Sequence, residues 1–302
     1  MHFVRGEHGR ARELAAELIN VAERLGDDDL RLEGSVAKGY ADLWGGNLAG
    51  ALAHFDRVRE TYDFDRHRGH AIQYGRDPLA SALTHMALAL WLSGQSEPAL
   101  ETMHEALRLA HRLSHPVSLA WALCFLSLLH LLREEPQHAR QRAEELVALA
   151  SGRQRLAFWS AWGSFLTHWS RAAMGEWAEG AEGMAHGLEE CRVIGANIAL
   201  PYFEGLRAYA AALGGDGRTG EDDLNRAVAA AERQGERWYQ PELYRMRGDL
   251  LLRAGEPDMA RGCFEQALVI ARSQGAKALE DRALGGLGLG SSSSSRATPS
   301  RR

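Results

Sequence analysis

The chain has 302 residues, of which 45% are hydrophobic, and carries a formal net charge of −5 at pH 7. This length allows a large core, while 35 basic against 40 acidic side chains exclude a basic footprint over the whole chain, so we expect no nucleic-acid partner. The cysteines Cys124, Cys191 and Cys263 are too sparse and odd in number for a disulfide framework, so we expect free thiols and a cytoplasmic location.

The first predicted element is a helix over Glu7–Leu25. Residues 1–7 before it contain no apolar run of signal-peptide length. The helix resembles the second half of a helix pair whose first half is missing. We therefore expect the chain to begin inside a repeat.

A repeated spacing of glycine and alanine runs along the chain. A glycine stands five residues before an alanine at Gly6 and Ala11, Gly46 and Ala51, Gly94 and Ala99, and Gly255 and Ala260. The interval from Gly6 to Gly46 is 40 residues, and that from Gly46 to Gly94 is 48, because an extra segment lies near His67–Arg76. Such a fixed period predicts a stack of similar supersecondary units.

The most apolar run of the chain lies between Pro116 and Leu132. It is shorter than the roughly 20 residues that a helix needs to span a bilayer, and it contains His130. We therefore expect no membrane partner.

The C-terminal half repeats most regularly, since Gly195, Gly235 and Gly275 follow one another at intervals of 40 residues. Within Glu242–Gln274 the apolar residues have helical spacing on both sides of a break at Gly255 and Pro257, which predicts two helices joined by a turn. No segment alternates with period two, so we predict no sheet.

The last pair opens at Ala276–Leu284, and the pattern is lost after Ala283. We expect the helical array to cover residues 1–288 and residues 289–302, rich in Gly, Ser and Arg, to be disordered. The abrupt loss of pattern indicates a fragment of a longer gene product; a natural short protein with a ragged end is the alternative.

Small and aromatic residues recur at equivalent places in several of the predicted helix pairs, and they resemble a known repeat family. The chain resembles tetratricopeptide-repeat (TPR) proteins at Gly248, Gly255, Ala260, Phe264 and Ala267, at Gly39, Gly46, Ala51 and Phe55, and at Ala87, Gly94, Ala99 and Ala106. The resemblance implies an all-α, right-handed superhelical solenoid of antiparallel helix hairpins, six in number and flanked by half-repeats. The period of about 40 residues exceeds the usual 34, so HEAT repeats, whose period is near 40, remain an alternative.

A narrower resemblance rests on residues 74–78, 87–94, 235–245 and 263–272. These segments look like the repeat region of bacterial signalling proteins that join a class III adenylate or guanylate cyclase domain, an ATPase domain and a C-terminal TPR array. The resemblance covers roughly residues 1–285. It implies a regulatory, partner-binding region in signal transduction and no cyclase or ATPase activity, because neither catalytic domain is in this chain.

Motifs for chemistry are missing from the sequence. The glycine-rich stretch 214–220 lacks the lysine of a phosphate-binding loop, and neither a GxSxG nor an HExxH motif occurs. His67 and His70, with His54 upstream, offer no obvious third metal ligand. We therefore expect no enzyme, no cofactor and no metal.

The inner face of the predicted array carries the candidate site. On the tetratricopeptide frame, the first helices of successive repeats place an aromatic series and a charged end on one surface: Trp121, Trp162, Phe165, Trp169, Tyr202, Tyr209, Arg245 and Asp249. Aromatic residues are enriched at binding hot spots, so this strip is a candidate peptide-binding groove. The alternative is that the longer repeats bury these aromatics in the core.

The sequence thus favours a protein-interaction scaffold whose partner is an extended or helical peptide with apolar anchors and a charged end. A small-molecule-sensing repeat domain of a transcriptional or cyclase regulator is the second hypothesis and a stand-alone enzyme the third. Terminal repeats normally carry polar caps, so we also expect self-association through the uncapped ends.

Overall fold

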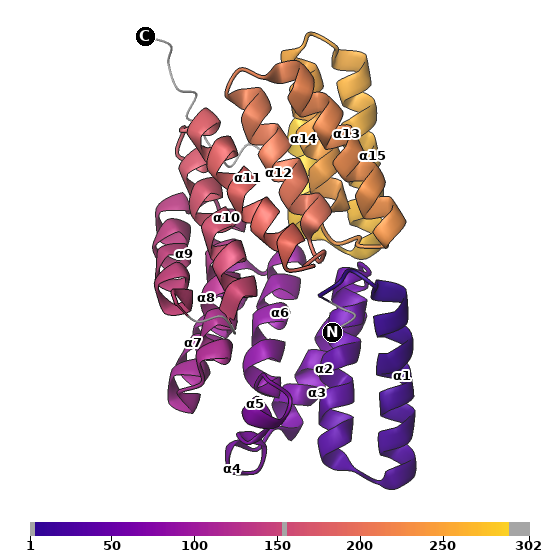
Figure 1. Ribbon diagram of the computed structural model, residues 1–302. Helices are drawn as coiled ribbons and strands as arrows, with labels where there is room; N and C mark the ends of the chain where they lie inside the picture. Colours follow the sequence, from indigo (N-terminus) through magenta and orange to yellow (C-terminus); the bar gives the residue numbers. More distant parts are fainter. Residues whose placement is uncertain (1–3, 153–155, 290–302) are drawn as a thin grey trace.

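The computed structural model describes residues 4–152 and 156–289, and within these ranges it contains helices and no strand (Figure 1). The predicted disordered tail lies outside the described residues, apart from Leu289. The all-helical class predicted from the period is therefore confirmed.

The helices form a series of antiparallel pairs, with one helix before and one after them. The first is α1 (His8–Leu25), and the last is α16 (Lys277–Gly286). Between them lie the pairs α2 (Asp28–Trp44) and α3 (Leu48–Thr61), α6 (Pro78–Leu92) and α7 (Ser96–Leu113), α8 (Pro116–Leu132) and α9 (Pro136–Ala150), α10 (Ala157–Ala173) and α11 (Trp177–Val193), α12 (Leu200–Leu213) and α13 (Gly217–Gln234), and α14 (Gln240–Arg253) and α15 (Pro257–Gln274).

The turn inside each pair uses one residue in the left-handed backbone region. These residues are Gly46, Gly94, Glu134, Gly175, Gly215 and Gly255. Glycine pays no Cβ penalty in this region, which is why it ends helices here. Glu134 adopts the same left-handed conformation, with a φ of +62°, in the one of these pairs whose turn lacks the glycine.

Helix starts are fixed by short polar side chains and prolines. The carboxylate of Asp77 accepts a hydrogen bond from the backbone N–H of Ala80 at 2.8 Å, and Pro78 occupies the first turn of α6. Asp27 caps α2 in the same way, accepting from Asp29 and Leu30. These contacts satisfy backbone donors that have no partner inside the helix.

Helices that are apolar on all sides form the centre of the core. Most residues of α6 and α8 are buried, whereas α7 is amphipathic and packs against both of them with its apolar face. Helix α13 is amphipathic too and packs against α12 and α14. Close packing depends on glycine where a phenylalanine of the partner helix sits: a Cβ at Gly39 would lie 2.3 Å from Phe55, and one at Gly248 would lie 2.6 Å from Phe264. Within the described residues, no helix is long and apolar enough to cross a membrane.

The extra segment between α3 and α6 forms two single-turn helices, α4 (Phe64–His67) and α5 (His70–Gln73). They bring two histidines against carboxylates of α2: His67 Nε2 lies 3.2 Å from Asp29, and His70 Nδ1 lies 2.8 Å from Glu33. Both rings are buried. The histidines noted in the sequence as a weak metal candidate therefore pair with acids and hold the insert in place.

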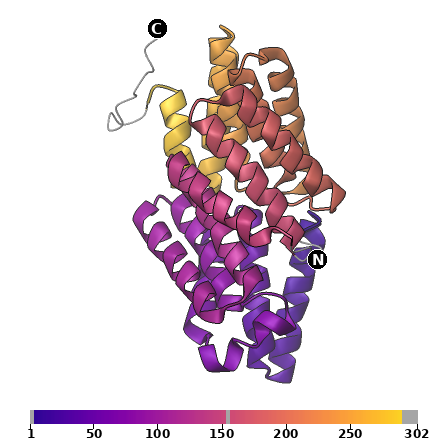
Figure 2. The same ribbon diagram turned by 60° about the vertical axis from the view of Figure 1, so that its left-hand side comes forward.

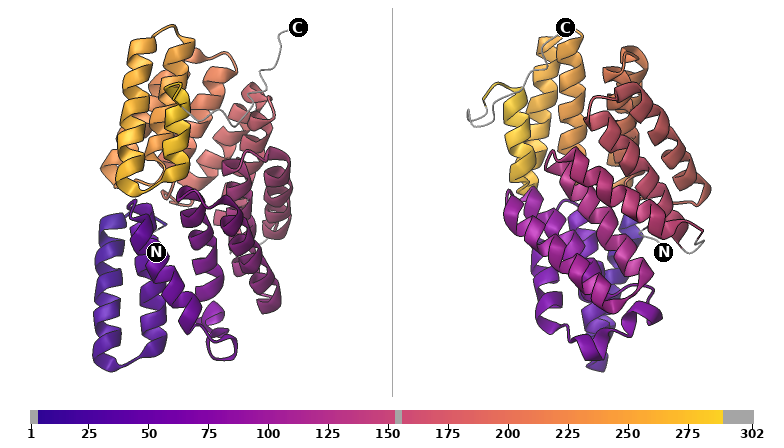
Figure 3. Two further views of the ribbon diagram at one scale, coloured as in Figure 1. Left: turned by 180° about the vertical axis from the view of Figure 1, so that it is seen from behind. Right: turned by 90° about the vertical axis from the view of Figure 1, so that its left-hand side faces the viewer.

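The chain turns back so that its last helices meet its first. The backbone N–H of Arg237 donates to the carbonyl of Trp44 at 2.8 Å, and that of Asn197 donates to the carbonyl of Val4 at 2.9 Å. Helix α16 lies against α6. From behind and from the side, α16, in yellow, stands beside the ends of the purple N-terminal helices (Figures 2 and 3).

Candidate functional site

Three of the eight residues predicted to line a groove lie in the core. Trp162, Phe165 and Tyr202 are 2%, 0% and 3% exposed. The ring of Phe203 packs between the pairs, 4.7 Å from the ring of Trp162 and 4.1 Å from that of Phe165, measured between centroids. Stacked first helices bury these aromatics against one another, so their surfaces are not open to a partner.

Trp121 lies elsewhere in the same aromatic packing. Its ring is 4.9 Å from Trp159 and 6.1 Å from Tyr40, and the side chain is half-buried. It does not line the cleft described next.

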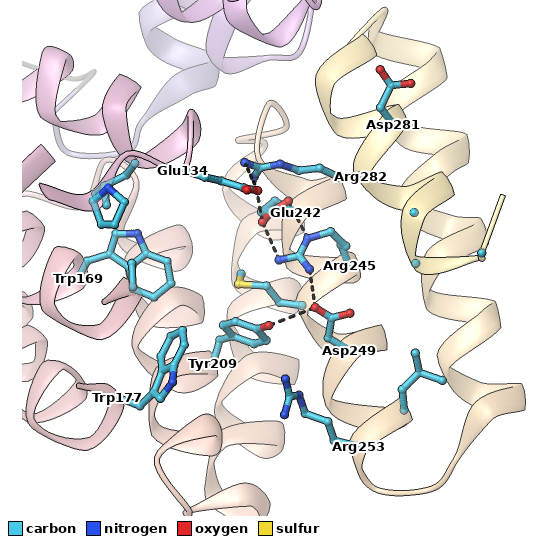
Figure 4. Close-up of a pocket in the computed structure, with 18 residues that line it drawn as sticks. Glu134, Trp169, Trp177, Tyr209, Glu242, Arg245, Asp249, Arg253, Asp281 and Arg282 are labelled. Atoms are coloured by element: carbon cyan, nitrogen blue, oxygen red, sulfur yellow. Dashed lines mark hydrogen bonds and ion pairs between the residues drawn. The ribbon is translucent and has the colours of Figure 1, made fainter. Parts of the chain in front are cut away.

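The other four predicted residues meet at one cleft. Trp169, Tyr209, Arg245 and Asp249 line a cavity of about 1100 Å³ between the first helices of the later pairs and α16 (Figure 4). The end of α8, the following turn and the start of α9 contribute Leu131, Glu134 and Pro136, respectively, to its rim. The remaining side chains that line the cleft are those of Ala173, Trp177, Glu242, Met246, Leu252, Arg253, Asp281 and Arg282.

One wall of the cleft is aromatic. Trp169 comes from the end of α10, Trp177 from the start of α11 and Tyr209 from α12, and all three are half-buried. The rings of Trp177 and Tyr209 meet edge to face, with centroids 6.5 Å apart. Each ring therefore keeps part of its surface free for contact within the cleft.

The opposite wall is an ion-pair network on α14. Arg245 Nη2 donates to Glu242 Oε1 at 2.8 Å, and its Nη1 pairs with Asp249. Tyr209 reaches across and donates its hydroxyl to Asp249 at 3.1 Å, which joins the two walls. Burial and Asp249 raise the pKa of Tyr209 to about 12 although Arg245 opposes the shift, so the phenol stays protonated.

Arg282 extends this network from α16. Its guanidinium donates to the carbonyl of Leu132 at 2.6 Å, lies 3.3 Å from Glu242, and stands 5.1 Å above the ring of Trp91. Burial alone would raise the pKa of Glu242, but Arg245 and Arg282 outweigh it and lower the pKa to about 2. Glu242 is therefore a fixed anion that ties α16 to α14.

The cleft offers binding surface of two kinds. The inner carboxylates Glu242 and Asp249 already face arginines, so their charges are compensated. Glu134, Arg253 and Asp281 carry charge at more exposed positions. Such a lining can hold an apolar group against the aromatic wall and a polar or charged group at the rim.

Sequence reasoning missed Trp177 and Arg282. Trp177 belongs to a second helix, and the inner-face frame counts first helices only. Arg282 lies in the helix after the last complete pair, and no local pattern indicates that this helix returns to α8. The one available signal was a tryptophan directly after the turn at Gly175.

The buried cysteines supply no nucleophile to this cleft. Cys124, Cys191 and Cys263 are free and buried, and burial together with Glu190 raises the pKa of Cys191 to about 12. Each behaves as a small apolar side chain.

The chain is similar to few known proteins. No family model matches the chain. An uncharacterized protein of Rhizobium meliloti (strain 1021) is 27% identical over 224 residues, which cover 74% of this chain. The match spans only 22% of that relative's length, so the chain corresponds to a minor part of it.

Proposed function

We propose that this chain is a non-catalytic interaction module that binds a peptide segment of a protein partner in the cleft between α10–α12 and α14–α16. The main observation in support is that the half-buried rings of Trp169, Trp177 and Tyr209 face the ion-pair network of α14 across an open cavity of about 1100 Å³. Exposed aromatic area gives large contact at low entropy cost and is typical of binding hot spots. An extended or helical peptide with apolar anchors and a charged end fits these two walls.

We also propose that the architecture is a tetratricopeptide-like superhelical array with a unit of about 40 residues. The left-handed turn residues at 94, 134, 175, 215 and 255, separated by 40 or 41 residues, support this proposal. So do the equivalent glycine–phenylalanine contacts of Gly39 with Phe55 and Gly248 with Phe264. Repeat arrays of this kind commonly work as binding scaffolds.

The biological setting that we propose is cytoplasmic bacterial signal transduction. It rests on the resemblance of four segments to the repeat region of cyclase–ATPase signalling proteins. The similarity to a small part of a much longer bacterial protein is compatible with a regulatory region.

The second candidate function is small-molecule sensing. The observation in its favour is that α16 and the α8–α9 turn bound the cleft, so that it is a limited cavity and not a long groove. Its volume is close to the range of ligand pockets, roughly 300–1,000 Å³. An aromatic ligand with a polar substituent would use the same two walls.

Peptide selection tests the proposal. A displayed random-peptide library is panned on the chain, and the selected peptides are measured by calorimetry against the native protein and the Trp169→Ala variant. We expect a shared apolar motif and weaker binding to the variant. Tyr74→Ala is the matched control, because Tyr74 is an exposed aromatic on the insert away from the cleft, and it should bind as the native protein does.

Two outcomes would count against peptide binding in this cleft. Peptides that bind both variants with the native affinity would place peptide binding outside the cleft. If no peptide is selected while a small-molecule library yields ligands that Trp169→Ala no longer binds, the second candidate function is favoured.

A further inference from the structure

A cluster of metal-type ligands lies at the turn between α8 and α9. One ligand atom each of His130, Glu135 and His138 falls within 4.8 Å of the other two. His130 is on the last turn of α8, Glu135 directly precedes α9, and His138 is on its first turn. The sequence search for HExxH missed this set because the three ligands come from two helices and the turn between them.

The backbone of the turn fixes the relative position of the ligands. The N–H of Glu135 donates to the carbonyl of His130 at 2.8 Å, and the N–H of Ala139 donates to the carbonyl of Glu135 at 3.0 Å. Glu134 provides the left-handed residue and Pro136 starts α9. A site on such a turn needs little rearrangement to accept a ligand, which favours binding.

The carboxylate of Glu135 is already oriented by an outer partner. Its Oε2 lies 2.6 Å from His130 Nδ1, while its Oε1 accepts from Arg133 Nε at 3.0 Å. Arg133 is itself anchored on α7 through the Ser96 carbonyl and hydroxyl, and its charge is shared by Glu97 at 3.0 Å. Outer hydrogen bonds of this kind hold a metal-ligating carboxylate in place.

We propose that His130, Glu135 and His138 form a binding site for Zn²⁺. Two imidazoles and one carboxylate are a ligand set that zinc takes in tetrahedral geometry, with a water in the fourth position. Zinc-to-ligand distances of about 2.0–2.2 Å in a tetrahedral site separate the ligand atoms by roughly 3.4 Å. The 2.6 Å contact between His130 Nδ1 and Glu135 must therefore open slightly as the ion enters, and the exposed side chain of His138 is free to turn toward the other two.

The bound ion would link the end of α8 to the start of α9. The cleft is lined by Glu134 of this turn and by Leu131 and Pro136 on either side of it, so zinc would also stiffen one rim of the proposed peptide site. The zinc site itself does not depend on that function, because its ligands are not among the residues that line the cleft.

Titration of the full-length, metal-free chain with Zn²⁺ tests the site. We expect the native protein to bind one equivalent of Zn²⁺ that the His138→Ala variant has lost or binds more than about tenfold more weakly, since one of three ligands is gone. Zn²⁺ should also raise the melting temperature of the native protein more than that of the variant. Co²⁺ in place of Zn²⁺ should give the visible absorption of a four-coordinate site in the native chain only.

His186→Ala is the control for loss of an exposed histidine, because His186 lies on α11 away from the cluster, and it should bind as the native protein does. Glu135→Gln is a second variant and should weaken binding like His138→Ala. A native chain that takes up no Zn²⁺, or a His138→Ala variant with unchanged stoichiometry and affinity, would overturn the proposal.

Discussion

Glu242 is a buried carboxylate held by two arginines from different helices, Arg245 on α14 and Arg282 on α16. Its pKa is lowered from 4.5 to about 2 in the folded protein. The sign of the effect on stability follows from this direction. A lowered pKa contributes stability that is fully present above the unfolded value of 4.5 and is lost as the pH falls toward 2. At neutral pH the contribution is on the order of 3 kcal/mol.

We therefore predict that unfolding stability of the native protein falls more steeply between pH 5 and pH 3 than that of Glu242→Gln, which has no carboxyl to protonate. Urea unfolding followed by circular dichroism at several pH values measures both slopes. Equal slopes would show that Glu242 is not held as an anion.

Trp162 shows what could and could not be predicted for single residues. The spacing of aromatics along first helices placed eight residues on one strip, of which four line the cleft. It could not decide whether that strip is open, because closure depends on how tightly the next helix packs. Phe203 and the neighbouring helices cover Trp162, whereas Trp169, one helical turn beyond Phe165, remains half-buried at the cleft.

At the scale of the elements, the turn inside each pair is the most regular feature of the chain, and Glu134 is its exception. A non-glycine residue in the left-handed region costs about 1 kcal/mol or somewhat more. Glu134 is mostly exposed, and its ion pair with Arg282 at 3.6 Å is long, so such a pair contributes little. We predict that Glu134→Gly raises the free energy of unfolding by about 0.5–1 kcal/mol.

Gly255→Ala is the matched opposite change. A Cβ at Gly255 would meet no atom within 4 Å, and its φ is +83°, so the cost is one of backbone conformation alone. We predict a loss of about 1 kcal/mol in denaturant unfolding. If Gly255→Ala stabilised the protein, or Glu134→Gly destabilised it, the turn geometry described for both pairs would be wrong.

Element boundaries show the limits of local patterns. The helix expected over Glu7–Leu25 is present as His8–Leu25 with Glu7 at its cap. The last helix was expected to end near Leu284, yet α16 continues through Gly285 to Gly286. A Cβ at Gly286 would lie 2.5 Å from the Phe264 ring, so this glycine permits close packing inside a helix that glycine propensity alone would end.

At the scale of the whole molecule, the return of α16 to α8 bounds the cleft. Arg282 joins three parts of the chain through Leu132, Glu242 and Trp91. We predict that Arg282→Ala lowers the free energy of unfolding by about 2–4 kcal/mol, because Glu242 keeps one cation instead of two in a buried place. Arg261→Ala, an exposed arginine on α15, should change it by less than about 0.5 kcal/mol. Thermal and urea unfolding measure both, and equal small losses would argue against closure by Arg282.

Contact between the two ends could not be predicted from the repeat. A period specifies the neighbours of each pair, whereas the accumulated rotation that brings Arg237 to Trp44 and α16 to α6 is a sum of small angles. Both ends also keep exposed apolar side chains, Leu25 at 68% and Leu289 at 69%. Self-association through the terminal helices therefore remains a prediction, which sedimentation at increasing concentration tests.

The most direct test compares two tryptophans on one helix, Trp162 and Trp169 of α10, for binding of a selected peptide and for thermal stability. Trp169→Ala should weaken binding by about 2 kcal/mol or more, as at a hot spot, with a small loss of stability. Trp162→Ala should cost about 3–5 kcal/mol of stability and, at a temperature where it is folded, bind the peptide with native affinity. Binding lost in Trp162→Ala at native stability, with Trp169→Ala unaffected, would contradict the assignment of the site to the cleft.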